Sequence, residues 1–155
     1  MIEPESATEW LELTSEELAS DRAVSWVTDG SCGAVTLFVG TVRDSAEDRT
    51  GVFAIDYEAY ESPALSRLSE IAGAARARYP GVGRIAVWHR VGRVALGEAS
   101  VVVAISAAHR DEAFQACRYA IDTVKETLPV WKLEHFDGGT DWSPASSPVR
   151  AVGEP

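Results

Sequence analysis

Residues 124–135 read VKETLPVWKLEH, and within them a helical pattern changes into a strand pattern. Residues 111 to about 128 are predicted to form an amphipathic helix, and residues 130–136 a strand that ends at Asp137-Gly138-Gly139. The apolar stripe of this helix is expected to contain Phe114, Cys117, Ile121, Val124 and Leu128. The stretch therefore joins the end of one helix directly to the start of one strand.

The same stretch holds both lysines of the chain, Lys125 and Lys132, while the other twelve of the 14 Lys and Arg residues are arginine. The pKa of a lysine falls readily when the ammonium group is desolvated or lies beside another cation, whereas arginine stays protonated in proteins. Proton transfer or covalent amine chemistry therefore requires lysine. A bias towards arginine that left two ordinary surface lysines explains the composition equally well, so the surrounding residues have to decide.

The first thirty residues predict one strand and one helix. Residues 9–13 (EWLEL) alternate apolar and acidic side chains, which is typical of a short edge strand. Thr14 and Glu17 fit a capping box, so a helix is expected to start near Ser15 and to restart at Ser20.

Two strands are expected next. Residues 33–43 (GAVTLFVGTVR) are β-branched and mostly apolar, which indicates a central strand. Residues 44–51 are polar and rich in turn formers, which predicts a loop. Residues 52–60 alternate well enough to be the partner of the central strand.

A second helix and two more strands precede the closing stretch. Ser62-Pro63 is expected to open the helix with Ser62 as N-cap, and Pro80-Gly81 to end it. Residues 84–91 and 99–107 are predicted strands joined by a turn that contains Gly97. The order of elements mixes hairpins with helical crossovers, which indicates an α+β fold with a mixed sheet. The buried side of the second helix is expected to contain Leu65, Leu68, Ile71, Ala72, Ala75 and Tyr79.

Length and composition limit the classes of protein. The chain has 155 residues, enough for a single domain over residues 1–142, and residues 143–155 are rich in Ser and Pro and are expected to form a loosely ordered tail. A net charge of −10 argues against a general nucleic-acid binder. The acidic first residues do not resemble a signal peptide, and no apolar run approaches the ~18 residues of a membrane span, so a cytoplasmic location is expected.

Cofactor signals are missing from the sequence. Cys32 and Cys117 provide neither a disulfide framework nor a metal-ligand spacing, so no metal is expected. No GxGxxG follows a strand and there is no P-loop, so no nucleotide cofactor is expected.

Polar residues gather in three places at the ends of apolar elements: Thr41-Val42-Arg43, His109-Arg110 and the lysine pair. His109-Arg110 begins the same helix that ends near Lys125, and a helix N-terminus favours anions. A helix of about 17 residues spans ~25 Å, so one chain cannot bring both ends to one small ligand without help. Either Lys132 and its strand fold back, or a second copy completes the site, which favours a homodimer with composite sites.

Each candidate also has an ordinary structural explanation. Arg43 can pair with Asp44, which is a common fate of an exposed arginine. His109 can cap its helix, and Lys125 at a helix C-terminus gains about 0.3–1 kcal/mol from the helix dipole. Cys117 lies on the apolar stripe, where packing explains it better than nucleophilic chemistry. Taken singly, these residues do not identify a function.

Five motifs together resemble one family, the large catalytic subunit of molybdopterin synthase. In chain order they are FVGTVR (38–43), YEAY (57–60), HRVG with GE (89–92 and 97–98), HRDEAF (109–114) and VKETLPVWKLE (124–134). The resemblance covers residues 33–142, and the Lys-x6-Lys unit around Pro-x-Trp-Lys is its most specific part. Asp44 stands where many relatives have asparagine.

The resemblance implies an α/β hammerhead-like fold with an additional small antiparallel sheet, and a homodimer that binds one small ubiquitin-like sulfur carrier at each end, giving a heterotetramer. The C-terminal Gly-Gly thiocarboxylate of the carrier would enter a pocket near Lys125. The substrate would be cyclic pyranopterin monophosphate (precursor Z), which receives two sulfurs to form the molybdopterin dithiolene in molybdenum cofactor biosynthesis. The enzyme itself would need no metal or organic cofactor.

The chemistry of the residues agrees with this sulfurtransferase activity. Arg43, His109 and Arg110 can receive a phosphate, and the thiocarboxylate is itself the nucleophile. Lys125 is assigned to the thiocarboxylate and Lys132 to the substrate, although the sequence leaves open which lysine performs which step. The remaining expected substrate-binding residues are Thr41, Val42, Phe38, Leu133 and Glu134. Two other functions stay open: a module that binds a ubiquitin-like tail without chemistry, and a phosphoester hydrolase that uses His109.

Overall fold

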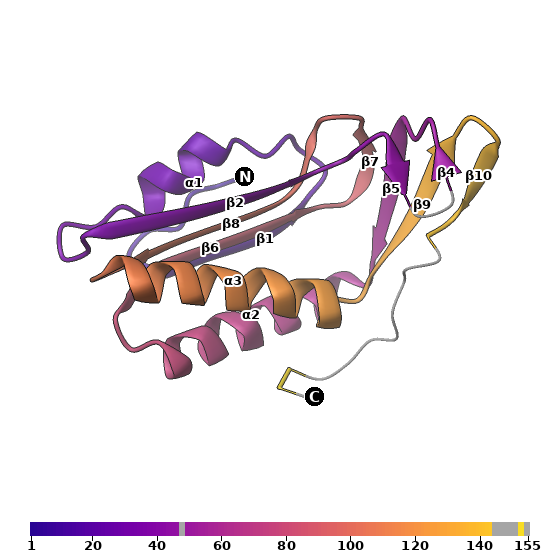
Figure 1. The fold of residues 1–155 in the computed structure, drawn as a ribbon. Coiled ribbons are helices and arrows are strands. Elements are labelled where there is room, and N and C mark those ends of the chain that lie inside the picture. Colours follow the sequence, from indigo (N-terminus) through magenta and orange to yellow (C-terminus); the bar gives the residue numbers. More distant parts are fainter. Residues whose placement is uncertain (47–48, 144–151, 154–155) are drawn as a thin grey trace.

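The computed structural model describes residues 1–46, 49–143 and 152–153, and it contains two main sheets and three helices within these residues (Figure 1). The helices are α1 (Ser20–Val27), α2 (Glu61–Arg78) and α3 (Arg110–Thr127). The strands are β1 (Glu9–Thr14), β2 (Ala34–Thr41), β3 (Ser45–Ala46), β4 (Arg49–Thr50), β5 (Ala54–Ala59), β6 (Val82–Arg90), β7 (Gly92–Ala95), β8 (Ala99–Ala107), β9 (Val130–Phe136) and β10 (Gly139–Trp142).

The first sheet has the order β1-β6-β8-β2. Strand β1 runs parallel to β6, whereas the β6–β8 and β8–β2 pairs are antiparallel, so the sheet is mixed. Helices α2 and α3 cover one face and α1 covers the other (Figure 1). Because successive side chains on a strand point to opposite faces, β6 sends Val87 towards α2 and α3 and Trp88 towards α1.

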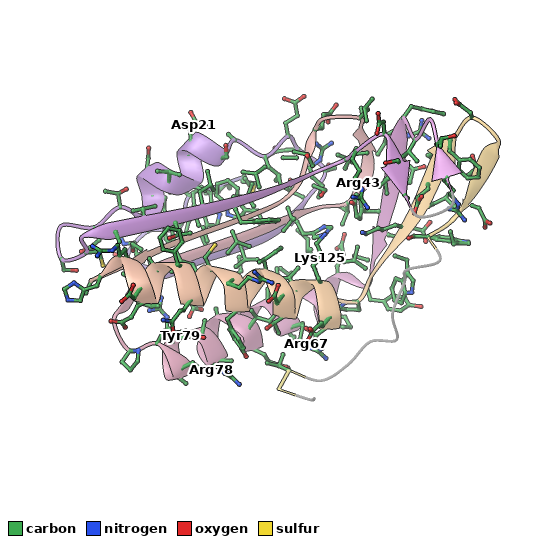
Figure 2. All side chains as sticks on the ribbon, in the orientation of Figure 1. Asp21, Arg43, Arg67, Arg78, Tyr79 and Lys125 are labelled. Atoms are coloured by element: carbon green, nitrogen blue, oxygen red, sulfur yellow. The ribbon has the colours of Figure 1, made fainter. Side chains whose placement is uncertain are left out.

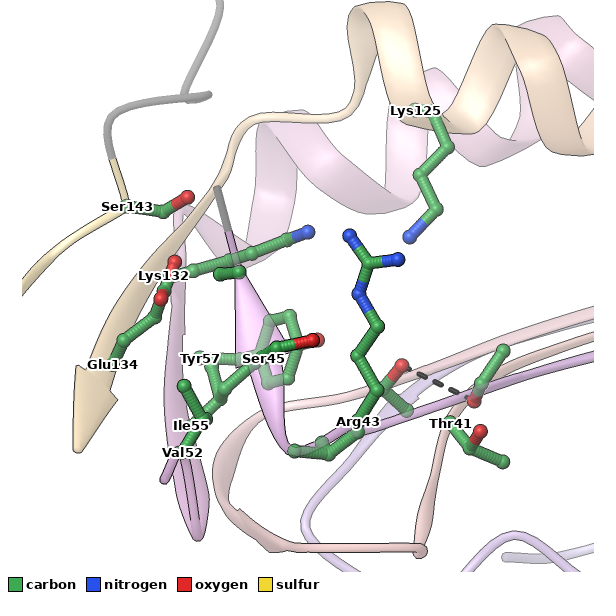
Figure 3. A pocket seen from close by; sticks show the side chains of 14 residues that line it. Thr41, Arg43, Ser45, Val52, Ile55, Tyr57, Lys125, Lys132, Glu134 and Ser143 are labelled. Atoms are coloured by element: carbon green, nitrogen blue, oxygen red, sulfur yellow. Dashed lines mark hydrogen bonds between the residues drawn. The ribbon is translucent and has the colours of Figure 1, made fainter. Parts of the chain in front are cut away.

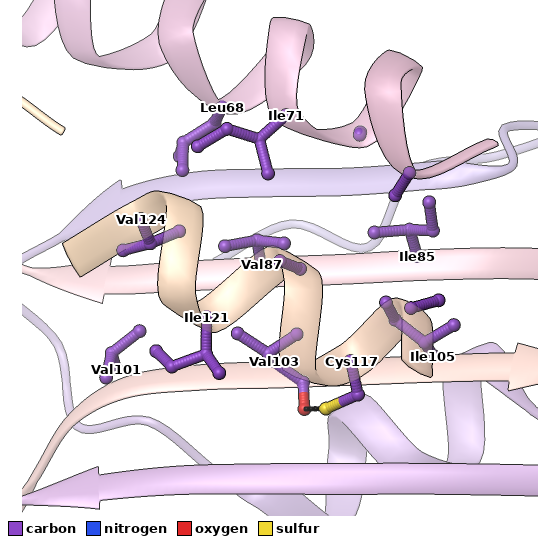
Figure 4. Close-up of a cluster of buried hydrophobic side chains, with 14 of the residues drawn as sticks. Leu68, Ile71, Ile85, Val87, Val101, Val103, Ile105, Cys117, Ile121 and Val124 are labelled. Atoms are coloured by element: carbon purple, nitrogen blue, oxygen red, sulfur yellow. Dashed lines mark hydrogen bonds between the residues drawn. The ribbon is translucent and has the colours of Figure 1, made fainter. Parts of the chain in front are cut away.

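The larger core lies between this sheet and the helices α2 and α3 (Figure 4). Leu68 and Ile71 of α2 and Ile121 and Val124 of α3 pack on the sheet. Burial of such aliphatic side chains stabilises the fold by about 1.5–3 kcal/mol each. The packing fixes the axis of α3 along the sheet and thereby fixes where its C-terminal end lies.

The second sheet has the order β10-β9-β5-β7 and is antiparallel throughout. It stands at the end of the first sheet, beyond the C-terminal end of α3 (Figure 1). Strands β3 and β4 pair as a two-stranded hairpin beside it. The α+β fold with an additional small antiparallel sheet is therefore confirmed.

Two predictions about strand placement were wrong. Strand β2 is an edge strand of the first sheet, because β8 pairs with one side of it and no described strand pairs with the other. Strand β5 pairs with β7 and β9 and not with β2. A β-branched apolar run looks the same at the centre and at the edge of a sheet whose two faces are covered by helices, so composition could not separate the two placements.

Local features were also predicted incorrectly. Thr14 does not cap a helix near Ser15: its hydroxyl accepts a hydrogen bond from the Glu16 amide at 3.1 Å, and α1 begins at Ser20. The N-cap of α2 is Tyr60, so Ser62 already lies inside that helix. Helical spacing also assigned Leu65 and Phe114 to buried stripes, but their side chains are exposed. In addition, residues 44–51 contain the β3–β4 hairpin, and the short strands β7 and β10 were not predicted.

The division into a domain over residues 1–142 and a loose tail stays a prediction, because most of the tail lies outside the described residues. Ser143 is buried, and its amide donates to the Lys132 carbonyl at 2.8 Å. Val152 packs against the larger core. None of the helices within the described residues is long and apolar enough to cross a membrane.

Candidate functional site

A cavity of about 300 Å³ opens where the two sheets meet at the C-terminal end of α3 (Figure 3). It is lined by residues from β2, the β3–β4 hairpin, β5, β8, α3 and β9. The lining residues are Gly40, Thr41, Val42, Arg43, Ser45, Ala46, Val52, Ile55, Tyr57, Ser100, Lys125, Lys132, Glu134 and Ser143. We call this cavity the basic pocket, because three cations converge in it.

The three cations of the basic pocket come from three different elements. Arg43 follows the end of β2, Lys125 lies in the last turn of α3, and Lys132 lies on β9. Figure 2 shows Lys125 and Arg43 at the same end of the first sheet, and Figure 3 shows the two ammonium groups and the guanidinium pointing towards one another. Pro129 ends α3 and turns the chain so that β9 folds back beside the helix end. The strand therefore returns Lys132 to the position of Lys125.

Lys125 has a strongly perturbed ammonium group. Burial of the group, and to a smaller extent the charge of Lys132, lower its pKa from 10.5 to about 8. Part of the side chain stays open to solvent at the mouth of the pocket. An amine with this pKa exists in both the protonated and the free form near neutral pH, which suits proton transfer.

Lys132 lies deeper beside a carboxylate. Burial lowers the pKa of Lys132, Glu134 raises it, and the nearby Arg43 lowers it. Glu134 is 2% exposed and lies two residues further along β9, on the same face of the strand. A buried carboxylate thus accompanies the three cations and reduces the net positive charge of the pocket.

A neutral polar side chain, Tyr57, lines the basic pocket, and His89 packs behind it. Burial raises the pKa of Tyr57, so its phenol stays protonated. His89 packs edge-on against Tyr57 with ring centroids 5.1 Å apart, and its Nδ1 lies 2.7 Å from the Arg90 carbonyl oxygen. Burial lowers the pKa of His89 to about 4, and the charges of Lys125 and Lys132 act in the same direction. His89 is therefore neutral at pH 7 and donates from Nδ1 to that carbonyl.

Four of the predicted site residues lie elsewhere in a single chain. His109 and Arg110 line a separate hollow at the opposite end of α3, together with Gly33, Ala108 and Asp111. Phe38 lies on the edge strand β2 and is 36% exposed. Leu133 lies between Lys132 and Glu134 on β9, so strand alternation points it to the other face of the sheet. Their predicted roles in substrate binding stay predictions.

Several pocket residues had no recognisable signal in the sequence. Ser45 comes from a stretch that was predicted to be a loop, and Tyr57 belongs to a motif whose role was not assigned. Ser100 reaches the pocket from β8 and donates to the Gly40 carbonyl at 3.2 Å. Ser143 was assigned to the tail. Only the packing of the two sheets brings these residues together.

The comparisons with known proteins give the family. The family model described as "MoaE protein" matches residues 13–127, which run from the end of β1 to the end of α3. The chain belongs to the MoaE family. A relative at 47% identity over 140 residues is the molybdopterin synthase catalytic subunit of Oryza sativa subsp. indica, and the alignment covers 90% of this chain and 72% of that protein.

Solved structures of other proteins have the same fold. The crystal structure of molybdopterin synthase from Staphylococcus aureus superposes with a TM-score of 0.79 at 30% identity, covering 84% of this chain and 94% of that one. A complex of subunits 1 and 2 of molybdopterin-converting factor from Helicobacter pylori superposes with a TM-score of 0.73 at 20% identity, covering 95% and 98%. The resemblance read from the five motifs is thus confirmed, and this MoaE chain is an enzyme of molybdenum cofactor biosynthesis.

Metal-ligand chemistry finds no support in the described residues. No group of three or more His, Cys, Asp or Glu side chains in residues 1–46, 49–143 or 152–153 is arranged to hold a metal ion. The donors that line the basic pocket are instead ammonium, guanidinium and hydroxyl groups, which suit anions.

Proposed function

We propose that the basic pocket transfers sulfur from the C-terminal thiocarboxylate of a small ubiquitin-like carrier to cyclic pyranopterin monophosphate, forming the dithiolene of molybdopterin. The observation that carries this proposal is the convergence of Arg43, Lys125 and Lys132 in one cavity of about 300 Å³. Both reactants are anions, one a phosphate and one a thiocarboxylate. A small cavity with three cations and one buried carboxylate can hold both at close range.

Each transfer consists of two substitutions. The thiocarboxylate sulfur bonds to a carbon of the pterin side chain, and an oxygen leaves that carbon as water or as the opened phosphate ester. Water then cleaves the acyl–sulfur bond and supplies the oxygen of the new carboxylate. The carrier leaves as a carboxylate, and the sulfur stays on the substrate. The protein must therefore stabilise anionic oxygens and move protons, while the carrier supplies the nucleophile.

The two lysines have environments that suit different parts of this work. Lys125, with a pKa of about 8, can donate and accept a proton near neutral pH, and we assign it to the thiocarboxylate and the acyl intermediate. Lys132 lies deeper, beside Glu134, and we assign it to the substrate as an electrostatic stabiliser or general acid. Arg43 can contact the phosphate with two parallel hydrogen bonds.

A second copy of the chain would bring His109 and Arg110 to the same pocket. No strand of the described residues pairs with the outer edge of β2, and Val35, Leu37 and Phe38 on it are each more than a third exposed. If two β2 edges pair antiparallel about a two-fold axis, the start of one strand lies beside the end of the other. His109 lies at the start of β2, because the Gly33 amide donates to the Ala108 carbonyl at 3.2 Å.

This pairing keeps both copies of α3 on the same face of the continuous sheet. An α3 of 18 residues is about 27 Å long, and a β2 of 8 residues spans about the same distance. The N-terminus of α3 in one copy therefore reaches the level of Lys125 in the other. We infer a homodimer with two composite sites, each of which uses the helix N-terminus of the partner copy as a phosphate receptor.

The carrier completes the assembly that we propose. The Helicobacter pylori neighbour is a complex of two different subunits, which supports a small-subunit partner for this chain. One carrier at each composite site gives a heterotetramer. We also propose that the reaction takes place in the cytoplasm, where the cysteines stay reduced; Cys32 and Cys117 form no disulfide.

The test is a reconstitution of the reaction. The chain is incubated with thiocarboxylated carrier and cyclic pyranopterin monophosphate, and the dithiolene product is detected. We expect product with the wild type, and none with Lys125→Ala or Lys132→Ala, although both variants still bind the carrier. Carrier binding without product in the wild type would leave only a binding module, and phosphate release without carrier would indicate a hydrolase that uses His109.

A further inference from the structure

Arg49 on β4 is the most extensively bonded arginine near the basic pocket, although it does not line it. Its Nη1 donates to the Asp141 carbonyl at 3.2 Å, and its Nη2 donates to the Trp142 carbonyl at 3.0 Å and to Asp141 Oδ2 at 3.3 Å. The guanidinium also lies over the Phe136 ring, 4.9 Å from its centroid. Its side chain is only 14% exposed.

The same guanidinium faces the buried carboxylate of the pocket. Nη1 of Arg49 lies 3.5 Å from Glu134 Oε2, and within the described residues this is the only ion pair of Glu134 shorter than 4.0 Å. Glu134 Oε2 has no hydrogen-bond partner among these residues. Lys132, two residues away on the same face of β9, makes no ion pair with this carboxylate, and its ammonium points to Arg43 and Lys125 (Figure 3).

We propose that Arg49 is a positioning residue that occupies the Glu134 carboxylate and thereby keeps the Lys132 ammonium free to contact the substrate. The proposal rests on the proposed function only for its kinetic consequence. A buried carboxylate seeks a counter-charge, because an unpaired buried charge is costly. Without Arg49, the cation within easiest reach of Glu134 is Lys132, so the lysine would turn towards it and away from the cavity.

The alternative is that Arg49 only stabilises the position of the β3–β4 hairpin against β10 through its hydrogen bonds. Its bonds to two backbone carbonyls support that view, and loss of the hairpin contact would also lower activity. The two roles differ in their dependence on Glu134. A stabilising role does not require the Glu134 charge, whereas the positioning role disappears when that charge is removed.

A double-mutant cycle separates the two roles. Arg49→Met, Glu134→Gln and the double variant are compared in the reconstituted reaction. In the wild-type background, we expect Arg49→Met to raise KM for the cyclic phosphate and to lower kcat/KM by about tenfold. In the Glu134→Gln background, we expect the same substitution to change kcat/KM by less than about twofold. Equal losses in both backgrounds would overturn the proposal.

Two further variants control for charge and folding. Arg49→Lys keeps the charge, and we expect it to restore most of kcat/KM. Arg76 is a matched control, because it also binds one carboxylate, of Glu9, and two backbone carbonyls, at a site on α2. Arg76→Met should leave KM for the substrate within about twofold of the wild type. If Arg76→Met raises KM as much as Arg49→Met, the effect is a general loss of structure.

A spectroscopic measurement tests the same proposal without substrate or carrier. Lys125 and Lys132 are the only lysines of the chain, so ¹³C-lysine labelling gives two side-chain signals. In Arg49→Met the pKa of Lys132 should rise, because Glu134 then stabilises its charged form, and the pKa of Lys125 should move less. An unchanged Lys132 titration in a folded Arg49→Met protein would contradict the positioning role, whether or not the reconstituted reaction succeeds.

Discussion

The pKa of Lys125 can be tested quantitatively, because the proposed proton transfer depends on it. Burial and the charge of Lys132 lower this pKa from 10.5 to about 8. At pH 7 the free amine then makes up about one tenth of the Lys125 population, compared with about 1 in 3,000 for an unperturbed lysine. The pocket therefore increases the amount of free base roughly 300-fold.

The perturbation is Lys132→Met, which removes the neighbouring charge and keeps the length of the side chain. Burial is the larger cause of the lowered pKa, so we expect the pKa of Lys125 to rise in this variant but to stay below 10.5. The assay is a pH titration of ¹³C-labelled lysine signals, and Lys132→Met leaves one signal that belongs to Lys125. A wild-type Lys125 signal that titrates near 10.5 would refute the reasoning, since neither burial nor Lys132 would then act on the amine.

Three further predictions follow from other parts of the structure. Lys125→Ala and His109→Ala should each be inactive. A 1:1 mixture of the two variants whose subunits have exchanged should recover about one quarter of wild-type activity, because one composite site in four is then intact. No recovery after confirmed exchange would mean that each chain holds its whole site. Burial raises the pKa of Cys117 to about 11, so a thiol reagent at pH 8 should modify Cys32 and leave Cys117 unmodified until the protein unfolds, as mass spectrometry can show. His89 has a folded-state pKa of about 4 against 6.5 for the free side chain, so the unfolded chain binds more protons between these two pH values. The free energy of unfolding of the wild type should therefore fall by up to about 3 kcal/mol from pH 6.5 to pH 4 relative to that of His89→Gln. Denaturant titrations in which the two proteins lose stability equally over this range would contradict the prediction.

The sequence predicted the elements with strong periodicity well. The bounds of β8 and β9 agree with the predicted strands at residues 99–107 and 130–136, and α3 differs from its prediction by one residue at each end. These segments are buried on one or both faces, so their patterns reflect real packing. Short strands such as β7 and β10 contain only four residues each, which is too few for a periodic signal.

The pairing of strands could not be predicted, because it depends on contacts that are distant in sequence. The strands predicted at residues 33–43 and 52–60 were expected to pair, but the hairpin β3–β4 lies between them in the chain and β5 joins a different sheet. Exposure of Phe114 has a similar cause. Helical spacing places it beside the buried stripe, but which residues at the border of that stripe are covered depends on elements distant in sequence, and the Phe114 side chain is 64% exposed.

The site was predicted in part. The unusual choice of lysine at Lys125 and Lys132 and the position of Arg43 after a strand were readable signals, and the structure brings all three to one pocket. Glu134 was an expected site residue, and it does line the pocket, on the same face of β9 as Lys132. The contribution of Arg49 to that carboxylate was not readable, since 85 residues of sequence, including two helices, separate the two side chains.

The central claim is that the basic pocket uses a lysine as an exchangeable proton carrier and that positive charge alone is insufficient. The most direct measurement is single-turnover dithiolene formation by Lys125→Arg, with carrier binding measured in parallel. Arginine keeps the charge but cannot lose its proton, so we predict a loss of at least about 100-fold in rate with carrier affinity nearly unchanged. A rate within about threefold of the wild type would contradict the claim, because a permanent cation would then be sufficient.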